Sequence, residues 1–538
     1  MDQNWERFCR YLFSDEDLGL QLDISKVSFP DDYLTAMQPQ LKAVYSGIRD
    51  LENGAIANPD EKRMVGHYWL RNPKLAPSSN IREEIESTWK SIKEFTQQIH
   101  NGLLTGEKGR RFQNVLVIGI GGSSLGPRFV ADALGHCGDK IKLYFLDNTD
   151  PDGLDRVLEP LQQDLDSTLT LVISKSGGTI ETRNGMEEVR RFYSINGLDF
   201  TKHAVSITQA GSKLALLSSE ENWLKAFPMW DWVGGRTSVL SAVGLLPLAL
   251  QGLDIDLLLE GAKKCDELTR REETKDNPAA LLALMWYKLT AGRGGKQMVI
   301  LPYKDRLELF PKYLQQLIME SLGKEKDLNG KVVQQGITVL GNKGSTDQHS
   351  YLQQLLEGPA NFFVTFIEVL KDREGESPLI AEESTSGDYL QAFYLGTRKA
   401  LAQKGRESIT ITINELTEFS LGVLIALYER AVSIYALLVN INAYHQPAVE
   451  LGKKGAGEVI ALKNQAVSFL RSHPGQAYTL EGLAAELEKI HKQKVDLETL
   501  FKILQHAAYN PDQGIVSGSK QGLAKPNCSY IYRAKVKK

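Results

Sequence analysis

The sequence predicts an α/β protein built from two parallel-sheet domains. Three observations support this fold class: short apolar strands alternate with helical segments, the alternation occurs twice along the chain, and the length is 538 residues. Continuous apolar strands between helices indicate parallel sheets covered on both faces. A single hydrophobic core stops growing near ~250–300 residues. We therefore expect a helical N-terminal segment at 1–110, α/β domains at 111–260 and 261–454, and a small C-terminal α+β accessory domain at 455–538.

The elements follow from local patterns. Helical spacing of apolar residues over 81–102 makes the N-terminal segment mainly helical. Four apolar runs in the first domain and three in the second predict strands. These runs are Val115–Ile118, Lys142–Leu146, Thr168–Ile173, His203–Ile207, Gln297–Leu301, Gly336–Leu340 and Phe362–Ile367. Two further apolar runs, at 239–250 and 421–439, are predicted as buried core helices. The first is too short to span a bilayer, and the second contains Glu429 and Arg430.

The composition is that of a soluble cytoplasmic protein. Hydrophobic residues make up 42% and charged residues 24% of the chain, as is usual for globular proteins. A net charge of −4 argues against nucleic acid or an anionic membrane as the main partner, because both select basic surfaces. The four cysteines are scattered, which fits a reducing compartment. The N-terminus lacks the basic and apolar regions of a secretory signal.

The C-terminal domain differs in character from the rest of the chain. Two short helices are predicted, one from Thr479 and one with Asp496 as its N-cap, followed by a segment ending in Tyr530-Ile531-Tyr532. The residues after Gly518 are basic, so a winged-helix nucleic-acid binder is one interpretation. We favour the other interpretation, an accessory domain of an enzyme.

The first turn that indicates chemistry lies between a strand and a helix in the first domain. It has the sequence GIGGSSLG over 119–126. Glycines let the backbone approach a ligand, and a helix N-terminus favours an anion. A dinucleotide-binding fingerprint would have a third glycine where Ser124 stands, although Asp147 ends the next strand, where a ribose-binding acid would lie. This turn alone leaves a dinucleotide and a smaller phosphate ligand both open.

The second turn favours a phosphate monoester. It has the sequence SKSGGT over 174–179 and also joins a strand to a helix. Its hydroxyl groups and backbone amides can donate hydrogen bonds to phosphate oxygens, and the helix dipole adds attraction. The spacing is not that of a Walker A loop, which argues against nucleoside triphosphates.

Six ordered motifs together resemble the glucose-6-phosphate isomerase (phosphoglucose isomerase) family, bacterial type. The resemblance runs from about residue 58 to residue 454 and leaves the C-terminal ~80 residues outside it. The motifs are the G-G-S turn at 121–123, SKSGGTIET at 174–182, WDWVGGR at 230–236, Met319-Glu320-Ser321, Gln348-His349, and Gln446 with VELGK at 449–453. The chain departs from the usual family pattern at SLGK (321–324), at NKGSTDQ (342–348) and at Pro447.

The resemblance implies an aldose–ketose isomerase that interconverts glucose 6-phosphate and fructose 6-phosphate, with two flavodoxin-like domains of the sugar-isomerase (SIS) type. It implies that Glu320 moves the proton between carbons through a cis-enediolate, and that Arg236 stabilises the enediolate. His349 and Lys453 would open the sugar ring. By apolar spacing alone Glu320 would be a surface carboxylate, because Leu314, Leu317, Ile318 and Leu322 form the buried face of its helix.

The resemblance also assigns the ligand-binding residues and the assembly. The phosphate and sugar would be held by Gly122, Ser123, Ser174, Lys175 (mainly by its backbone), Ser176, Thr179, Gly235 and Gln446. A homodimer is implied, with His349 contributed across the interface. No cofactor is expected. No metal is expected either, because the sequence has no clustered ligands such as H-x-x-x-H.

Two alternatives remain beside this interpretation, and a third is excluded. A sugar-phosphate-sensing regulator would keep the phosphate turns without needing Glu320, Arg236, His349 and Lys453 together. A nicotinamide-dependent dehydrogenase would use the first turn and bind NAD, which the second turn disfavours. A glucosamine-phosphate synthase would need a cysteine at position 2, where this chain has Asp2.

Overall fold

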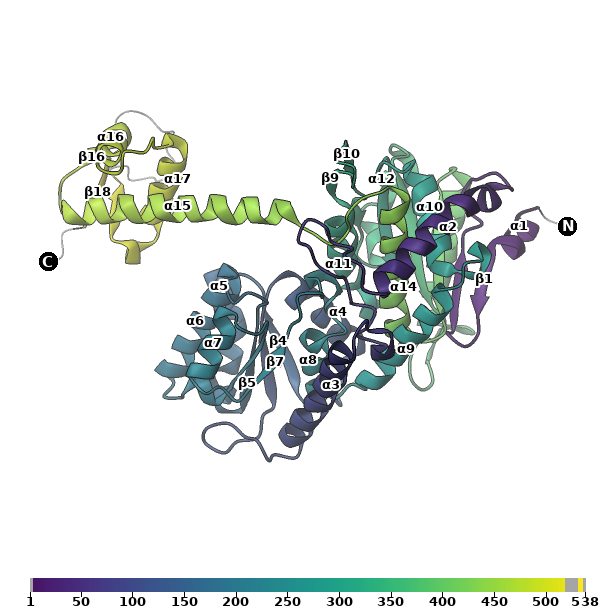
Figure 1. Cartoon of the computed structure of the whole chain (residues 1–538), viewed down its shortest axis with the longest axis horizontal. Helices are drawn as coiled ribbons and strands as arrows, with labels where there is room; N and C mark the ends of the chain where they lie inside the picture. The colour runs from purple at the N-terminus through teal and green to yellow at the C-terminus, as the bar shows by residue number, and fades with distance from the viewer. Residues whose placement is uncertain (1–2, 518–530, 536–538) are drawn as a thin grey trace. The chain divides into compact units, whose positions relative to one another are not determined.

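The chain folds into two units, residues 1–445 and residues 446–538. The computed structural model describes residues 3–517 and 531–535. The larger unit contains both parallel sheets, and the smaller one contains the C-terminal helices (Figure 1). The domain boundary expected at 454–455 lies inside α15 (Pro447–Ser472), because this helix is continuous and begins directly after the boundary between the units.

The first sheet has five parallel strands in the order β4-β3-β5-β6-β7. Their bounds are Asn114–Ile118 for β3, Lys142–Leu146 for β4, Thr168–Ile173 for β5, Ala204–Thr208 for β6 and Lys225–Pro228 for β7. The four strands expected here are confirmed, with β6 displaced by one residue. The edge strand β7 was not expected.

Helices cover both faces of this sheet, as its apolar strands predict. The side chains of β3 alternate between two cores: Leu116 and Ile118 pack with one set of helices, and Val115 and Val117 with the other. The first set is α5 (Pro151–Leu158), α6 (Ile180–Ile195) and α7 (Lys213–Glu220), which Figure 1 shows together on one side of the sheet. The second set is α3 (Ser79–His100), α4 (Leu125–Leu134) and α8 (Ala242–Gln251).

The second sheet has six strands in the order β1-β2-β15-β12-β8-β11. The strands β8 (Gln297–Pro302), β11 (Val339–Leu340), β12 (Phe362–Val369) and β15 (Ser408–Ile413) are parallel to one another. The strands expected at 297–301 and 362–367 are confirmed. The run at 336–340 forms a strand only over its last two residues, and β15 was not expected.

Helices also cover both faces of the second sheet. One face packs against α12 (Leu352–Glu357) and α13 (Ser386–Gln403). The other shares the large core of the unit with α2 (Tyr33–Glu52), α9 (Ile255–Thr269), α10 (Pro278–Thr290), α11 (Phe310–Leu314) and α14 (Glu418–Leu438). By length and composition α14 could cross a membrane, but it is buried against α9 and α10 as the sequence predicted for a core helix.

The N-terminal segment adds strands that its helical pattern did not predict. After α1 (Gln3–Tyr11), the hairpin of β1 (Leu12–Asp15) and β2 (Leu20–Asp23) joins the second sheet antiparallel to β15. Leu20 and Leu22 are fully buried there. The segment is therefore not purely helical, because its first apolar residues complete a sheet that is formed by residues far along the chain.

A buried network of ion pairs connects α9 with α14. Asp266 of α9 accepts hydrogen bonds from Arg71 at 2.7 and 2.8 Å and from Arg430 of α14 at 2.9 Å. Arg71 also pairs with Glu429, and Arg430 with Glu52. These arginines hold the pKa of the Asp266 carboxyl well below its ordinary value, in spite of its complete burial.

The second unit is a small α+β domain around its own core. It contains α15, β16 (Tyr478–Thr479), α16 (Leu480–His491), α17 (Leu497–Tyr509), β17 (Ile515–Ser517) and β18 (Ile531–Ala534). The helix starts predicted at Thr479 and Asp496 are confirmed, since both side chains cap their helices. The order of its three strands is β16-β18-β17. Most of the basic tail, including Lys520, Lys525 and Tyr530, lies outside the described residues.

Candidate active site

The first glycine turn lies against the segment that carries Arg236. It follows β3 and forms a short 3-10 helix, Gly121–Ser123. A Cβ atom added to Gly122 would lie 1.9 Å from the carbonyl oxygen of Gly235, so only glycine allows this contact between two backbones. Ser238 donates a hydrogen bond to the carbonyl of Gly122 at 3.2 Å. The first turn and the Arg236 segment, distant in sequence, are thus held together by a close main-chain contact and a side-chain hydrogen bond.

Arg236 is buried in the next 3-10 turn, Gly235–Thr237. Its Nη2 donates to the carbonyl oxygens of Ala443 at 2.8 Å and His445 at 3.1 Å. Its Nη1 lies 3.1 Å from Oε1 of Glu320. Burial lowers the pKa of the guanidinium from its ordinary value, but arginine stays protonated at neutral pH. The result is a fixed cation beside a carboxylate.

Glu320 ends a π-helical turn, Gln315–Glu320, that continues α11. Such wide turns within helices occur frequently at functional sites. The leucines and isoleucine of the apolar face are buried as expected, while the Glu320 side chain keeps 19% of its surface exposed and pairs with Arg236. The surface position that apolar spacing alone predicts for Glu320 is therefore wrong, because the π turn and the Gly235–Thr237 segment meet over it.

The second turn is organised to present its amides and hydroxyl groups. Ser174 Oγ accepts a hydrogen bond from the Gly177 amide at 3.1 Å and donates to Thr179 Oγ1 at 3.3 Å. Thr179 is the N-cap residue of α6, and Ser176 Oγ accepts from the Gly178 amide at 3.1 Å. The hydroxyl of Thr182 in the first turn of α6 is buried and has no hydrogen-bond partner among the residues that the structure describes.

The ammonium of Lys175 is engaged by main-chain carbonyls and is not available for a direct contact with phosphate. Its Nζ donates to the carbonyl oxygens of Asp231 at 2.9 Å and Val233 at 3.1 Å, in the motif that precedes Arg236. Burial lowers its pKa to about 8. The side chain therefore connects the second turn with the Arg236 segment, and the backbone role expected for Lys175 stays a prediction.

The structure does not bring every expected residue to the Arg236–Glu320 pair. His349 ends the 3-10 turn Thr346–His349, is exposed, and has no hydrogen bond or ion pair with Arg236 or Glu320 in the described structure. Gln446 and Lys453 belong to the second unit, where Gln446 precedes α15 and Lys453 lies within it. The side chain of Lys453 is outside the described structure.

Two neighbours of the pair were not identified from sequence. Lys324, at the start of β9 (Lys324–Lys326), is buried and donates from Nζ to the carbonyl oxygen of Glu320 at 2.6 Å. His445 lies close enough to Lys324 for that cation to help lower its pKa, although burial is the larger cause. The lysine of the SLGK segment, four residues after Glu320, was the available signal for Lys324.

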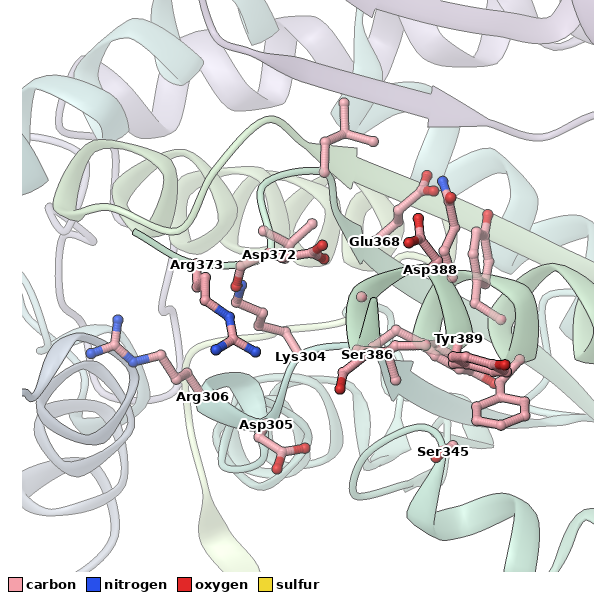
Figure 2. Close-up of a pocket in the computed structure, with 18 of the residues that line it drawn as sticks. Lys304, Asp305, Arg306, Ser345, Glu368, Asp372, Arg373, Ser386, Asp388 and Tyr389 are labelled. Carbon is pink, nitrogen blue, oxygen red and sulfur yellow. The ribbon is translucent and has the colours of Figure 1, made fainter. Parts of the chain in front are cut away.

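A separate cavity of about 730 Å³ opens at the carboxyl ends of β8 and β12. Figure 2 shows its polar lining, which includes none of the expected site residues. Much of this lining is engaged within the protein: Lys304 donates to the carbonyl of Lys371 at 2.8 Å, and Asp388 caps α13. In the described chain, this cavity included, no group of three or more His, Cys, Asp or Glu side chains is placed to hold a metal ion.

Comparisons with known proteins show the family to which the chain belongs. The family model for phosphoglucose isomerase matches residues 23–476. Glucose-6-phosphate isomerase of Desulfitobacterium hafniense (strain Y51) is 64% identical over 512 residues, which is 95% of each chain, and that of Geobacter sulfurreducens is 58% identical over 98% of each chain.

Two solved structures are similar over most of the chain. A glucose-6-phosphate isomerase from Chlamydia trachomatis has a TM-score of 0.77 at 27% identity and covers 85% of this chain and 90% of its own. A hypothetical protein from Thermus thermophilus has a TM-score of 0.70, also at 27% identity, and covers 82% of this chain and all of its own.

Proposed function

This chain belongs to the phosphoglucose isomerase family, and we propose that it interconverts glucose 6-phosphate and fructose 6-phosphate. The observation that carries the proposal is the pairing of Glu320 with the buried Arg236 at 3.1 Å, beside two turns suited to a phosphate. The reaction serves glycolysis and gluconeogenesis. The enzyme is cytoplasmic and needs neither a cofactor nor a metal.

Proton transfer between C1 and C2 is the chemistry of the pair. Glu320 takes the proton from one carbon and returns it to the other, a step for which a positioned carboxylate contributes roughly 10²–10⁴-fold. Negative charge then moves from the carboxylate to the enediolate oxygens of the substrate. Arg236 stabilises that charge without reorganising, because the carbonyl oxygens of Ala443 and His445 hold its other terminal nitrogen.

The two turns and the Gly235 segment hold the rest of the substrate. Ser123 and Gly122 of the first turn, and Ser174, Ser176 and Thr179 of the second, donate hydrogen bonds to the phosphate. Lys175 contributes its backbone, since its ammonium is engaged elsewhere. Gly235 and Gln446 contact the sugar.

Ring opening requires a proton transfer at the ring oxygen, which we assign to His349 with assistance from Lys453. Histidine titrates near neutrality and suits this step. The proposal includes a homodimer in which each subunit supplies His349 to the site of its partner, as the family resemblance implies. The exposed position of His349 supports it.

Turnover by the purified protein tests the function. Fructose 6-phosphate should be converted to glucose 6-phosphate without added metal or nucleotide. Glu320→Gln should lose at least about 10²-fold in kcat with a nearly unchanged KM. Glu325→Gln, the same chemical change at an exposed neighbour, is the matched control and should behave as wild type. Full activity in Glu320→Gln would show that the base is misassigned.

Subunit mixing tests the shared site. Glu320→Gln and His349→Ala chains, each inactive alone, are denatured together and refolded. In half of the resulting dimers one site has both native residues, so about a quarter of wild-type activity should return. If activity does not rise above that of the separate variants, His349 does not act across the interface.

A further inference from the structure

Lys324 is a second buried cation next to the Arg236–Glu320 pair. Only 5% of its surface is exposed, and no carboxylate lies within ion-pair distance of its ammonium in the described parts of the chain. Its one hydrogen bond is to the main-chain carbonyl of Glu320, at 2.6 Å. A buried ammonium without a carboxylate partner is costly, so this position is a poor one for a lysine with a packing role alone.

The hydrogen bond is placed to control the orientation of Glu320. At the end of the turn the carbonyl of Met319 accepts a hydrogen bond from the amide of Gly323 at 2.8 Å. The next carbonyl, that of Glu320 itself, accepts from the ammonium of Lys324. The chain then leaves the turn through Gly323, where a Cβ would lie 2.7 Å from the carbonyl oxygen of Met319. The backbone of Glu320 is thus fixed from the C-terminal side, while Arg236 fixes its carboxylate.

The charges around Lys324 come from four elements. Arg236 of the 3-10 turn disfavours the protonated amine, and Glu320 and Asp60 favour it. His445 faces it from the segment that binds Arg236. Burial is the largest influence, and together these effects lower the pKa of Lys324 to about 7. Its charge therefore changes within the physiological pH range.

We propose that Lys324 is a positioning residue for the isomerisation: it holds the main chain of Glu320 through its hydrogen bond, and it places a second cation next to the Arg236–Glu320 pair. The inference rests on the proposed role of Glu320 as the base. It assigns a role to Lys324, the last residue of the SLGK segment, in which the chain departs from the usual family pattern at Leu322.

Two substitutions separate the hydrogen bond from the charge. Lys324→Met removes both, and should lower kcat roughly tenfold or more with KM within about threefold, because small displacements of a catalytic group are costly. It should also move the acid limb of the pH profile of kcat/KM upward by about half to one pH unit. Lys324→Gln keeps a donor without the charge. It should recover most of kcat while retaining the shifted limb.

Lys326→Met is the matched control, because Lys326 is exposed on the same strand, and its kcat, KM and pH profile should equal those of wild type. Wild-type kcat and pH profile in Lys324→Met would overturn the proposal. If Lys324→Met fails to fold, Lys324→Gln decides: an unshifted acid limb of its kcat/KM profile refutes the role of the charge.

Glu320→Gln is measured alongside the Lys324 variants. Full activity of Glu320→Gln would refute the assignment of Glu320 as the base. If Glu320→Gln is inactive while the Lys324 variants keep wild-type kinetics, only the role of Lys324 is refuted.

Discussion

Gly122→Ala should move the first glycine turn away from the segment that carries Arg236. The new methyl group would lie 1.9 Å from the carbonyl oxygen and 2.2 Å from the carbonyl carbon of Gly235. Real Cβ atoms essentially never approach other atoms more closely than 3.0 Å, so the backbones must move apart by about 1.1 Å. Neither contact is with a flexible side chain that could turn away. Arg236, the next residue after Gly235, would move with its segment relative to the first turn.

A displacement of about 1 Å can cost about 10²-fold in rate, which corresponds to about 2.7 kcal/mol of transition-state stabilisation. We therefore expect kcat/KM for fructose 6-phosphate to fall about 100-fold in Gly122→Ala. Overpacking should also destabilise the fold by about 1–3 kcal/mol. The assay is initial-rate kinetics, with thermal unfolding of the same samples.

Gly396→Ala is the control for the chemical change itself. Gly396 lies within α13, and a Cβ there meets no atom within 4 Å. This variant should keep wild-type kinetics and gain up to about 1 kcal/mol of stability. If Gly122→Ala keeps more than half of the wild-type kcat/KM, the close contact between Gly122 and Gly235 does not position the site, and the reasoning fails.

The remaining predictions concern stability and metal independence. Asp266→Asn should destabilise the larger unit by about 3–5 kcal/mol, because it leaves the guanidinium groups of Arg71 and Arg430 buried without their shared carboxylate. Since the folded-state pKa of Asp266 is depressed, its contribution to stability is present above pH ~4 and is lost as the pH falls below that value. The free energy of unfolding, measured with urea from pH 3 to 7, should therefore fall less toward low pH in the variant than in wild type. Parallel curves for the two proteins would contradict this. Asp496→Ala removes the N-cap of α17 and should lower the stability of the second unit by about 1 kcal/mol. Circular dichroism should show a lower melting temperature, and kcat should stay unchanged. A loss of kcat would show that α16 and α17 of the second unit contribute to the reaction. Dialysis against EDTA should leave turnover intact, and activity that returns only with a divalent ion would refute the metal-free mechanism.

The candidate site was predictable from sequence wherever the chemistry is local. The second turn illustrates this, because its hydroxyl groups, its glycines and the helix start at Thr179 lie within one short segment. The hydrogen bonds of Ser174 are made to other residues of the same segment. Asp496 and Thr479 illustrate it for the fold, since capping depends on the next three residues. The hairpin of β1 and β2 was missed because its partner, β15, lies near the other end of the larger unit.

Glu320 shows what periodicity cannot decide. Its helix has the expected buried apolar face, and by that pattern the carboxylate is a surface group. The structure places a π turn at this point and brings the Arg236 segment over it, a contact between residues far apart in the chain. Lys324 was missed for the same reason: its significance comes from the carbonyl of Glu320 and from its burial, not from its neighbours in sequence.

The sequence by itself determined the α/β class, the positions of most strands and helices, both glycine-rich turns and the family, because these depend on apolar periodicity, turn chemistry and ordered motifs. Only the tertiary structure decided that Arg236 pairs with Glu320, that the ammonium of Lys175 binds main-chain carbonyls of the Arg236 segment, and that Lys324 holds the main chain of Glu320. Burial and approach between distant segments set these contacts, and both are properties of the packed chain.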